Sequence, residues 1–197
     1  MSYLFLIITC FIICCVLIKR RVYTLSKQFS SISEEKILLD MLGKIPIIKK
    51  ARKLLKDRYD AAEKIIYLYH RNRSISSVAI AAHEAAHVKQ AQAGSIAISL
   101  YKYKSYKAID AIYPFALLFL LPFVHHSIPI FIFFTVFIAM KIGRLIIEIN
   151  ATSIALRYLK QLLLPEEYVK ARNLLMMTTS SYVLMPALYA SLLGLIL

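Results

Sequence analysis

Two histidines and a glutamate lie within the alanine-rich stretch AIAAHEAAHVKQ, residues 79–90, and their spacing matches the H-E-x-x-H pattern of zinc hydrolases. On a helix, His83 and His87 are four residues apart and project from one face, whereas Glu84 is offset toward a neighbouring stripe. Two imidazoles so placed can hold one zinc ion, while the carboxylate reaches the metal-bound water instead of the metal. The spacing therefore predicts His83 and His87 as zinc ligands and Glu84 as the catalytic base.

Small residues surround this motif, and they leave a simpler interpretation open. A slim alanine helix with polar side chains on its surface needs no metal, whereas a catalytic zinc site needs a third protein ligand. Alanines would also let another helix or a substrate approach the metal closely. The alanines are Ala81, Ala82, Ala85 and Ala86, and the candidates for the third ligand are Glu148, His70, His125 and His126.

The composition of the whole chain indicates a membrane protein. Of its 197 residues, 59% are hydrophobic and only 18% are charged, which lies outside the usual range of soluble domains. We therefore predict one domain covering residues 1–197, a mostly α, multi-pass integral membrane protein with a small zincin-like core and a short edge strand. The sequence contains four apolar runs that are candidate spans, at about 2–18, 108–124, 128–147 and 174–197.

The basic residues are placed on one side of these runs. Nineteen lie between Lys19 and Lys107 and six between Lys141 and Arg172, which together make up all 25. The positive-inside rule then predicts that the segments 19–107 and 148–173 are cytoplasmic and that both termini lie outside. The formal charge of +14 is explained by this topology and by attraction to anionic lipid headgroups, so no nucleic-acid partner is expected.

Local signals predict two helices between the first apolar run and the zinc motif. Ser31 and Glu34 have the spacing of a capping box, which would open a helix that ends near Gly43. Pro46 then starts a second, basic amphipathic stretch that reaches about Lys56.

The segment EKIIYLYH, from Glu63 to His70, is rich in Ile and Tyr and is predicted to form a short strand. Ser74 and Ser76 are candidate caps of the helix that carries the motif. Beyond the hydrophobic hairpin, a helix is expected from Glu148 to about Leu164, and Pro165 restarts another.

The predicted topology separates the candidates for the third ligand. His125 and His126 lie at the corner of the hairpin, across the membrane from His83, and His70 is typical of a solvated turn. Glu148 follows the return of the hairpin to the face that holds the H-E-x-x-H helix. Its alternative role, an ion pair with Arg144, is worth only about 0.2 to 0.5 kcal/mol. Glu148 is therefore the predicted third ligand.

Four longer segments carry a family resemblance. The zinc helix, SSVAIAAHEAAHVKQAQAG, is preceded by DRYDAAEKIIYL and followed by EINATSIALRYL and EEYVKARNLLMMTTSSYV. In this order, with a hydrophobic hairpin between the two zinc motifs, they resemble the membrane-bound putative neutral zinc metallopeptidases, the YugP-like proteins of bacteria. The resemblance implies a glutamate-zincin in which His83, His87 and Glu148 bind one zinc ion and Glu84 is the catalytic base.

The chain departs from that family at three positions. The family often has glycine where Ala86 stands, commonly aspartate where Asn150 stands, and a histidine near Arg58. An amide at position 150 would orient a zinc-bound imidazole less strongly than a carboxylate, so Asn150 bears on activity. Thr152, one helical turn beyond Glu148, is a candidate for contact with a ligand.

These observations predict a zinc-dependent metallopeptidase that cleaves peptide or protein substrates at the surface of the lipid bilayer. We expect a cell-membrane location with the active site on the cytoplasmic side. A zinc-stabilised membrane scaffold or an inactive protease relative is the alternative, and a basic surface module without metal is a third. Four residues are candidates for stabilising the oxyanion, although each also fits a structural role: Tyr69, His70, Arg157 and Tyr182.

Overall fold

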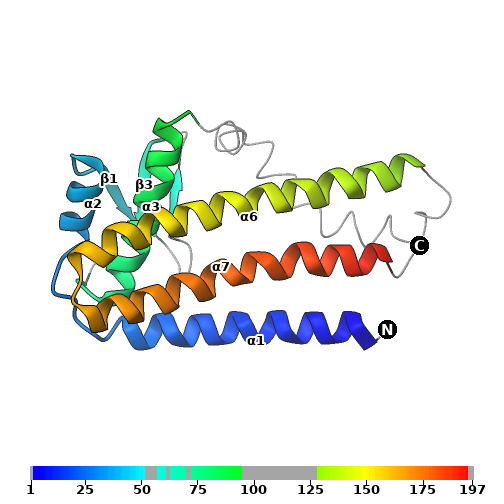
Figure 1. Ribbon diagram of the computed structural model, residues 1–197, viewed down its shortest axis with the longest axis horizontal. Helices are drawn as coiled ribbons and strands as arrows, with labels where there is room; N and C mark the ends of the chain where they lie inside the picture. Colours follow the sequence, from blue (N-terminus) through cyan, green and yellow to red (C-terminus); the bar gives the residue numbers. More distant parts are fainter. Residues whose placement is uncertain (1, 52–56, 61–62, 70–71, 95–127, 195–197) are drawn as a thin grey trace.

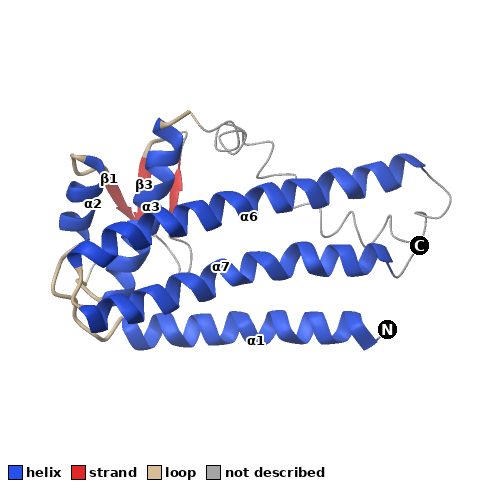
Figure 2. Ribbon diagram, viewed as in Figure 1, coloured by secondary structure: helices blue, strands red, loops and turns tan. Residues whose placement is uncertain are grey.

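The computed structural model describes residues 2–51, 57–60, 63–69, 72–94 and 128–194. Three long helices lie along its longest axis (Figure 1): α1 (Ser2–Leu25), α6 (Ile128–Leu162) and α7 (Pro165–Gly194). At one end, α2 (Glu34–Leu42), α3 (Ile75–Gln92) and a small sheet pack against them (Figure 2). The mostly helical part of the prediction is confirmed.

The sheet has three strands in the order β1 (Ile47–Lys50), β3 (Ile65–Leu68), β2 (Arg58–Asp60). Strand β3 is parallel to β1 and antiparallel to β2. It confirms the predicted strand, but the expected edge position is wrong because β3 is central. Strand β1 occupies the stretch predicted to be an amphipathic helix, because backbone pairing with β3 outweighs the local pattern there.

Helix α2 ends where the sequence predicts, but another residue caps its start. The Ser33 hydroxyl accepts a hydrogen bond from the Lys36 backbone N–H at 3.3 Å, and Gly43 ends the helix with a φ of +70°. The predicted cap, Ser31, instead donates from its backbone N–H and its hydroxyl to Glu167 of α7, at 2.8 and 2.7 Å. The carboxylate of α7 therefore competes successfully for Ser31.

Helix α3, which carries the H-E-x-x-H motif, lies at the centre of the packed end. Ser74 and Ser77 form a reciprocal capping box at its start, which confirms Ser74 as the cap. The helix contacts α2, α6, α7 and the sheet. Its small side chains allow this close approach on several sides, and five alanines are fully buried: Ala79, Ala81, Ala82, Ala85 and Ala86.

Helices α6 and α7 run antiparallel and are joined by a short turn at Leu163 and Leu164. Pro165 is the first residue of α7, and Glu166 and Glu167 lie in its first turn, near the positive end of the helix dipole. This confirms the predicted restart at Pro165.

The predicted membrane spans need correction. The runs 2–18, 128–147 and 174–197 fall in α1, α6 and α7, but no helix within the described residues has the length and apolar character that crossing a membrane requires. The run 108–124 lies outside the described residues. The four-span integral membrane architecture is therefore wrong for the described helices. The multi-pass cell-membrane location and the cytoplasmic placement of the segments 19–107 and 148–173, which were deduced from those spans, are corrected with it.

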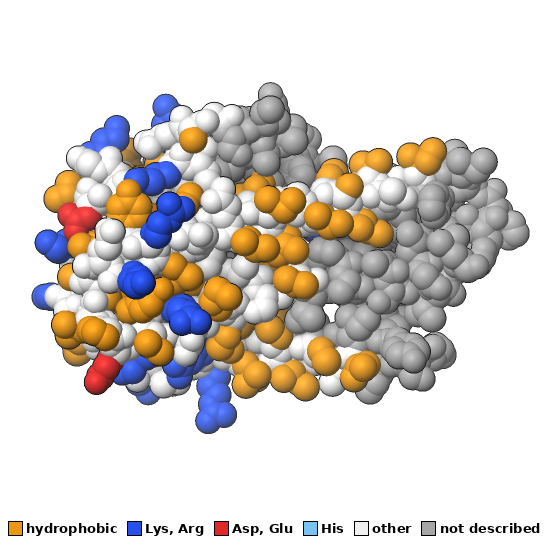
Figure 3. All heavy atoms as spheres, in the orientation of Figure 1, with side chains coloured by type: hydrophobic (Ala, Val, Ile, Leu, Met, Phe, Trp, Pro, Cys, Tyr) orange, Lys and Arg blue, Asp and Glu red, His pale blue; other side chains and the backbone are white. Residues whose placement is uncertain are grey.

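The physical reason lies in how the long helices pack. Near the packed end, apolar residues of α1 and α7 serve as core positions of a shared helical interior, whereas Ile12, Ile13 and Val16 of α1 stay exposed. Those that are buried there include Ile18, Val22, Leu25, Leu174 and Leu175. In the view of Figure 3, Lys and Arg side chains gather over the end that holds α2 and α3, while hydrophobic side chains follow the long helices.

The buried alanines yield the first prediction. Ala86→Leu adds three carbon atoms to a fully enclosed site and should lower the free energy of unfolding by about 1 to 3 kcal/mol, measured by urea denaturation. Ala93→Leu makes the same change at an exposed position after α3 and should have an effect within about 0.5 kcal/mol. Equal stability of the two variants would contradict the tight packing around α3.

Candidate metal centre

Helices α3 and α6 bring together three metal-ligating side chains. Glu148 Oε2 on α6 lies 3.1 Å from His83 Nε2 and 3.4 Å from His87 Nε2 on α3. The potential ligand atoms of the three residues all lie within 4.8 Å of one another. The two imidazole rings are nearly perpendicular, at 87°, with centroids 4.8 Å apart. Both Nε2 atoms therefore approach the same carboxylate oxygen.

The donor set and its spacing fit a zinc ion. Ligands held tetrahedrally at about 2.0 to 2.1 Å from a metal lie about 3.3 to 3.4 Å from each other. The two separations between Glu148 and the imidazoles are close to this value. Two imidazoles and one carboxylate form a set typical of catalytic zinc sites. His83, His87 and Glu148 are thus the residues that could hold the ion.

The charges of these groups support one another. Burial opposes ionisation of His87, but hydrogen bonding to Glu148 and the charges of Glu84 and Glu148 raise the pKa of the imidazole to about 9. Burial would raise the pKa of Glu148, yet hydrogen bonds from His83 and His87 hold that pKa well below its ordinary range. At neutral pH these shifts favour an imidazolium–carboxylate pair of His87 and Glu148.

Glu84 lies beside this cluster on the buried side of α3. Burial raises the pKa of its carboxyl group, the charges of His87 and His83 oppose the shift, and Glu148 and Asp57 add to it. A carboxylate with a raised pKa binds a proton more readily near neutral pH, as a general base requires.

A second set of hydrogen bonds orients the imidazoles from behind. Gln90, which is buried, accepts a hydrogen bond from His87 Nδ1 with its Oε1 at 2.9 Å, and its Nε2 donates to the Ile147 carbonyl at 3.0 Å. In the neutral form of His87, this hydrogen bond favours the tautomer with hydrogen on Nδ1, which leaves Nε2 free for a metal. Gln90 also ties α3 to the residue that precedes Glu148. Sequence reasoning missed it, although its place one turn after His87 is a usable signal.

His83 has an analogous partner in Thr152. The Thr152 hydroxyl lies 3.3 Å from His83 Nδ1 and 2.7 Å from the Thr179 hydroxyl on α7. The suggested contact of Thr152 with a ligand is therefore present. Asn150, by contrast, is exposed and makes no hydrogen bond to the three ligand candidates within the described part of the chain. The amide at position 150 therefore does not take the orienting role that its place beside Glu148 suggests.

The second oxygen of Glu148 faces a cation. Arg144 Nε lies 3.8 Å from Glu148 Oε1, so the ion pair considered as an alternative role of Glu148 exists together with the contacts to the histidines. The Arg144 guanidinium also lies 5.1 Å from the ring centre of Tyr182 on α7. Burial, followed by the charge of Glu148, raises the pKa of Tyr182 to about 12.

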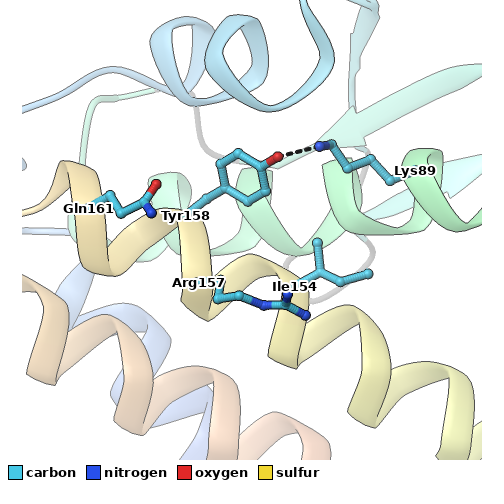
Figure 4. A pocket seen from close by; sticks show the side chains of 5 residues that line it. All are labelled: Lys89, Ile154, Arg157, Tyr158 and Gln161. Atoms are coloured by element: carbon cyan, nitrogen blue, oxygen red, sulfur yellow. Dashed lines mark hydrogen bonds between the residues drawn. The ribbon is translucent and has the colours of Figure 1, made fainter.

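The other candidates are not among the three clustered side chains or lie outside the described residues. Arg157 lines an open pocket of about 400 Å³ between α3 and α6, beside Tyr158, which accepts a hydrogen bond from Lys89 (Figure 4). The backbone N–H of Tyr69 donates to Asp57. His70, His125 and His126 lie outside the described residues.

Comparison with known proteins adds the family. The sequence pattern of the putative neutral zinc metallopeptidase family matches residues 3–197. The chain belongs to this family. The resemblance inferred from the four segments is thereby confirmed. Neither the curated proteins nor the solved structures contain a significant match.

An imidazole must be neutral to bind a metal ion, so zinc binding by this site should depend on pH. Zinc must displace the proton that His87 holds with a pKa of about 9, so zinc affinity should fall about tenfold per pH unit as the pH drops below 9. Competition with a chelator of known pH dependence measures this slope.

Glu148→Gln provides the comparison for that measurement. It removes the carboxylate that favours the imidazolium, so zinc binding should be weaker. In a plot of the logarithm of zinc affinity against pH, the bend that marks the pKa of His87 should move to lower pH. A bend near the ordinary histidine pKa of about 6.5 in the unmodified protein would contradict the buried ion pair.

The contacts of Gln90 give a further prediction. Gln90→Leu keeps the approximate size of the side chain but removes both hydrogen bonds, so zinc affinity should fall about 10- to 100-fold at constant pH. Gln92→Leu, two residues further along α3 at an exposed position, should leave the affinity unchanged. An unaltered affinity in the Gln90 variant would exclude its role in orienting His87.

Proposed function

We propose that this protein is a zinc-dependent peptidase that hydrolyses peptide bonds with a zinc-activated water. The observation that carries the proposal is the convergence of His83, His87 and Glu148 on one point, with the carboxylate of Glu84 buried beside them. The family assignment supports the same class of reaction.

Each side chain then has a defined task. His83, His87 and Glu148 would hold one zinc ion, which when bound supplies Lewis acidity and lowers the pKa of a coordinated water to about 7. Glu84 takes a proton from the attacking water and later gives it to the nitrogen of the leaving amine. Gln90 and Thr152 keep the imidazoles oriented while this proton moves.

The alternative is a zinc site that only stabilises the fold. A structural zinc site usually closes its fourth position with another side chain. Within the described residues, the candidate cluster offers three ligands, which leaves a position for water. A structural site also gives no role to Glu84, which is buried beside the cluster. Both observations favour catalysis.

The position of β2 suggests how an extended peptide would bind. Strand β2 contacts α3, and within the described part of the sheet it has no partner on its outer side. Asp57 directly precedes β2, and its charge acts on Glu84, so this edge lies near the catalytic base. A substrate that pairs with β2 would hold its backbone close to the cluster. The edge offered to substrate is thus β2 rather than the central β3.

Glu84→Gln tests the proposal because it preserves size but removes the base. Turnover of a mixed library of quenched fluorescent peptides should fall by about 10² to 10⁴, while bound zinc and the fold are retained. Glu166→Gln makes the same change at an exposed position at the start of α7 and should keep full activity. Equal turnover of Glu84→Gln and the unmodified protein at equal zinc occupancy would reject a peptidase function.

A further inference from the structure

The packing of α6 against α7 places one more side chain beside the metal centre. The hydroxyl groups of Thr152 and Thr179 lie 2.7 Å apart and fix how the two antiparallel helices are aligned. Glu148 lies one helical turn before Thr152 on α6, and Tyr182 lies one helical turn after Thr179 on α7. Residues three or four apart share a helix face, so Tyr182 lies on the face of α7 that meets Glu148.

Arg144 connects the Tyr182 ring to the cluster. Its guanidinium lies 5.1 Å from the Tyr182 ring centre and donates a hydrogen bond to the phenol, while its Nε lies 3.8 Å from Glu148 Oε1. The charges of both Glu148 and Glu84 influence the phenol. Tyr182 therefore lies within electrostatic reach of the predicted third ligand and of the predicted base.

The phenol of Tyr182 is equipped to donate a hydrogen bond. An ordinary tyrosine, with a pKa of about 10, is already protonated at neutral pH. Its oxygen accepts from Arg144, and no acceptor for its hydrogen is found among the residues that the structure describes. The O–H group thus remains available to a substrate.

We propose that Tyr182 donates a hydrogen bond to the oxygen of the scissile carbonyl group as negative charge develops there. This inference rests on the proposed peptidase function. The water oxygen bonds to the carbonyl carbon while Glu84 takes its proton, and the π electron pair of the C=O bond moves onto the carbonyl oxygen. Tyr182 shares its hydrogen with that oxygen without transferring it. When the electron pair returns, the C–N bond breaks and the nitrogen takes the proton from Glu84.

Arg144 has a different task in this arrangement. Its guanidinium is engaged by Glu148 and Tyr182, so it positions the phenol rather than contacting the substrate. Arg157, the other cation considered from sequence, lines the pocket beside Lys89 and is not part of the cluster. Tyr182, rather than either arginine, is thus the donor that we place at the reacting carbonyl.

Tyr182→Phe removes the donor and keeps the ring. The kcat for a peptide substrate should fall about 10²- to 10³-fold, with KM and zinc content little changed. Affinity for a phosphinic peptide, which mimics the tetrahedral arrangement, should fall by a similar factor, whereas a hydroxamate that binds chiefly through zinc should bind as before. Tyr158→Phe, in the pocket between α3 and α6, should change none of these quantities.

The outcomes separate the two proposals. Full turnover and unchanged phosphinic affinity in Tyr182→Phe, beside an inactive Glu84→Gln, would overturn the role of Tyr182 and leave the peptidase function intact. Full turnover in Glu84→Gln would reject the peptidase function itself. If Tyr182→Phe does not fold, 3,5-difluorotyrosine at position 182 keeps the phenol but lowers its pKa. The alkaline limit of kcat should then move to lower pH, and an unchanged limit would also overturn the role of Tyr182.

Discussion

The close approach of α3 to its neighbours is the constraint on which the rest of the structure depends. Large side chains on α3 would keep α6 away, and the carboxylate of Glu148 would then not reach the two imidazoles at 3.1 and 3.4 Å. Alanines on the buried faces of α3 remove this obstacle. Ile75, Val78 and Val88 add larger apolar side chains of α3 to the core. Two polar links connect α3 to α6: Gln90 donates to the Ile147 carbonyl, and the Thr152 hydroxyl lies 3.3 Å from His83 Nδ1.

Placing four ionisable groups together in a largely buried site costs free energy unless their charges compensate. Here the groups are His83, His87, Glu84 and Glu148. The cluster meets this requirement with a proton, since a pKa of about 9 favours charged His87 at neutral pH beside an ionised Glu148. Arg144 adds a second positive charge on the other oxygen of Glu148. The fold itself therefore gathers the three candidate ligands, and a zinc ion that bound there would replace a proton.

The motif was readable from sequence because its chemistry depends on spacing within one helix. Four residues separate His83 from His87, and helical periodicity alone places them on one face. Glu148 was also found, but through a four-span topology that the described helices do not support. The length of an apolar run does not distinguish a helix that packs against other helices from one that lies in lipid.

Features that depend on residues far away along the chain could not be predicted from local sequence patterns. Ser31 has the right spacing for a cap, yet Glu167, 136 residues away, binds it and leaves Ser33 as the cap. The stretch after Pro46 has an amphipathic pattern, and pairing with β3 makes it a strand. The orienting role of Gln90 depends on its hydrogen bond to the Ile147 carbonyl on another helix. Local pattern carries no information about such partners.

The order of parts along the chain has a consequence for biosynthesis. The H-E-x-x-H helix leaves the ribosome first, whereas Glu148 follows 65 residues after His83 and Tyr182 later still. Helix α1 also packs on α7, so the earliest and the latest helices must meet before the core closes. Such long-range contacts make folding slow and place it late in synthesis. A nascent chain that ends before Glu148 therefore carries two of the three candidate zinc ligands, and the cluster stays incomplete until α6 has been synthesised.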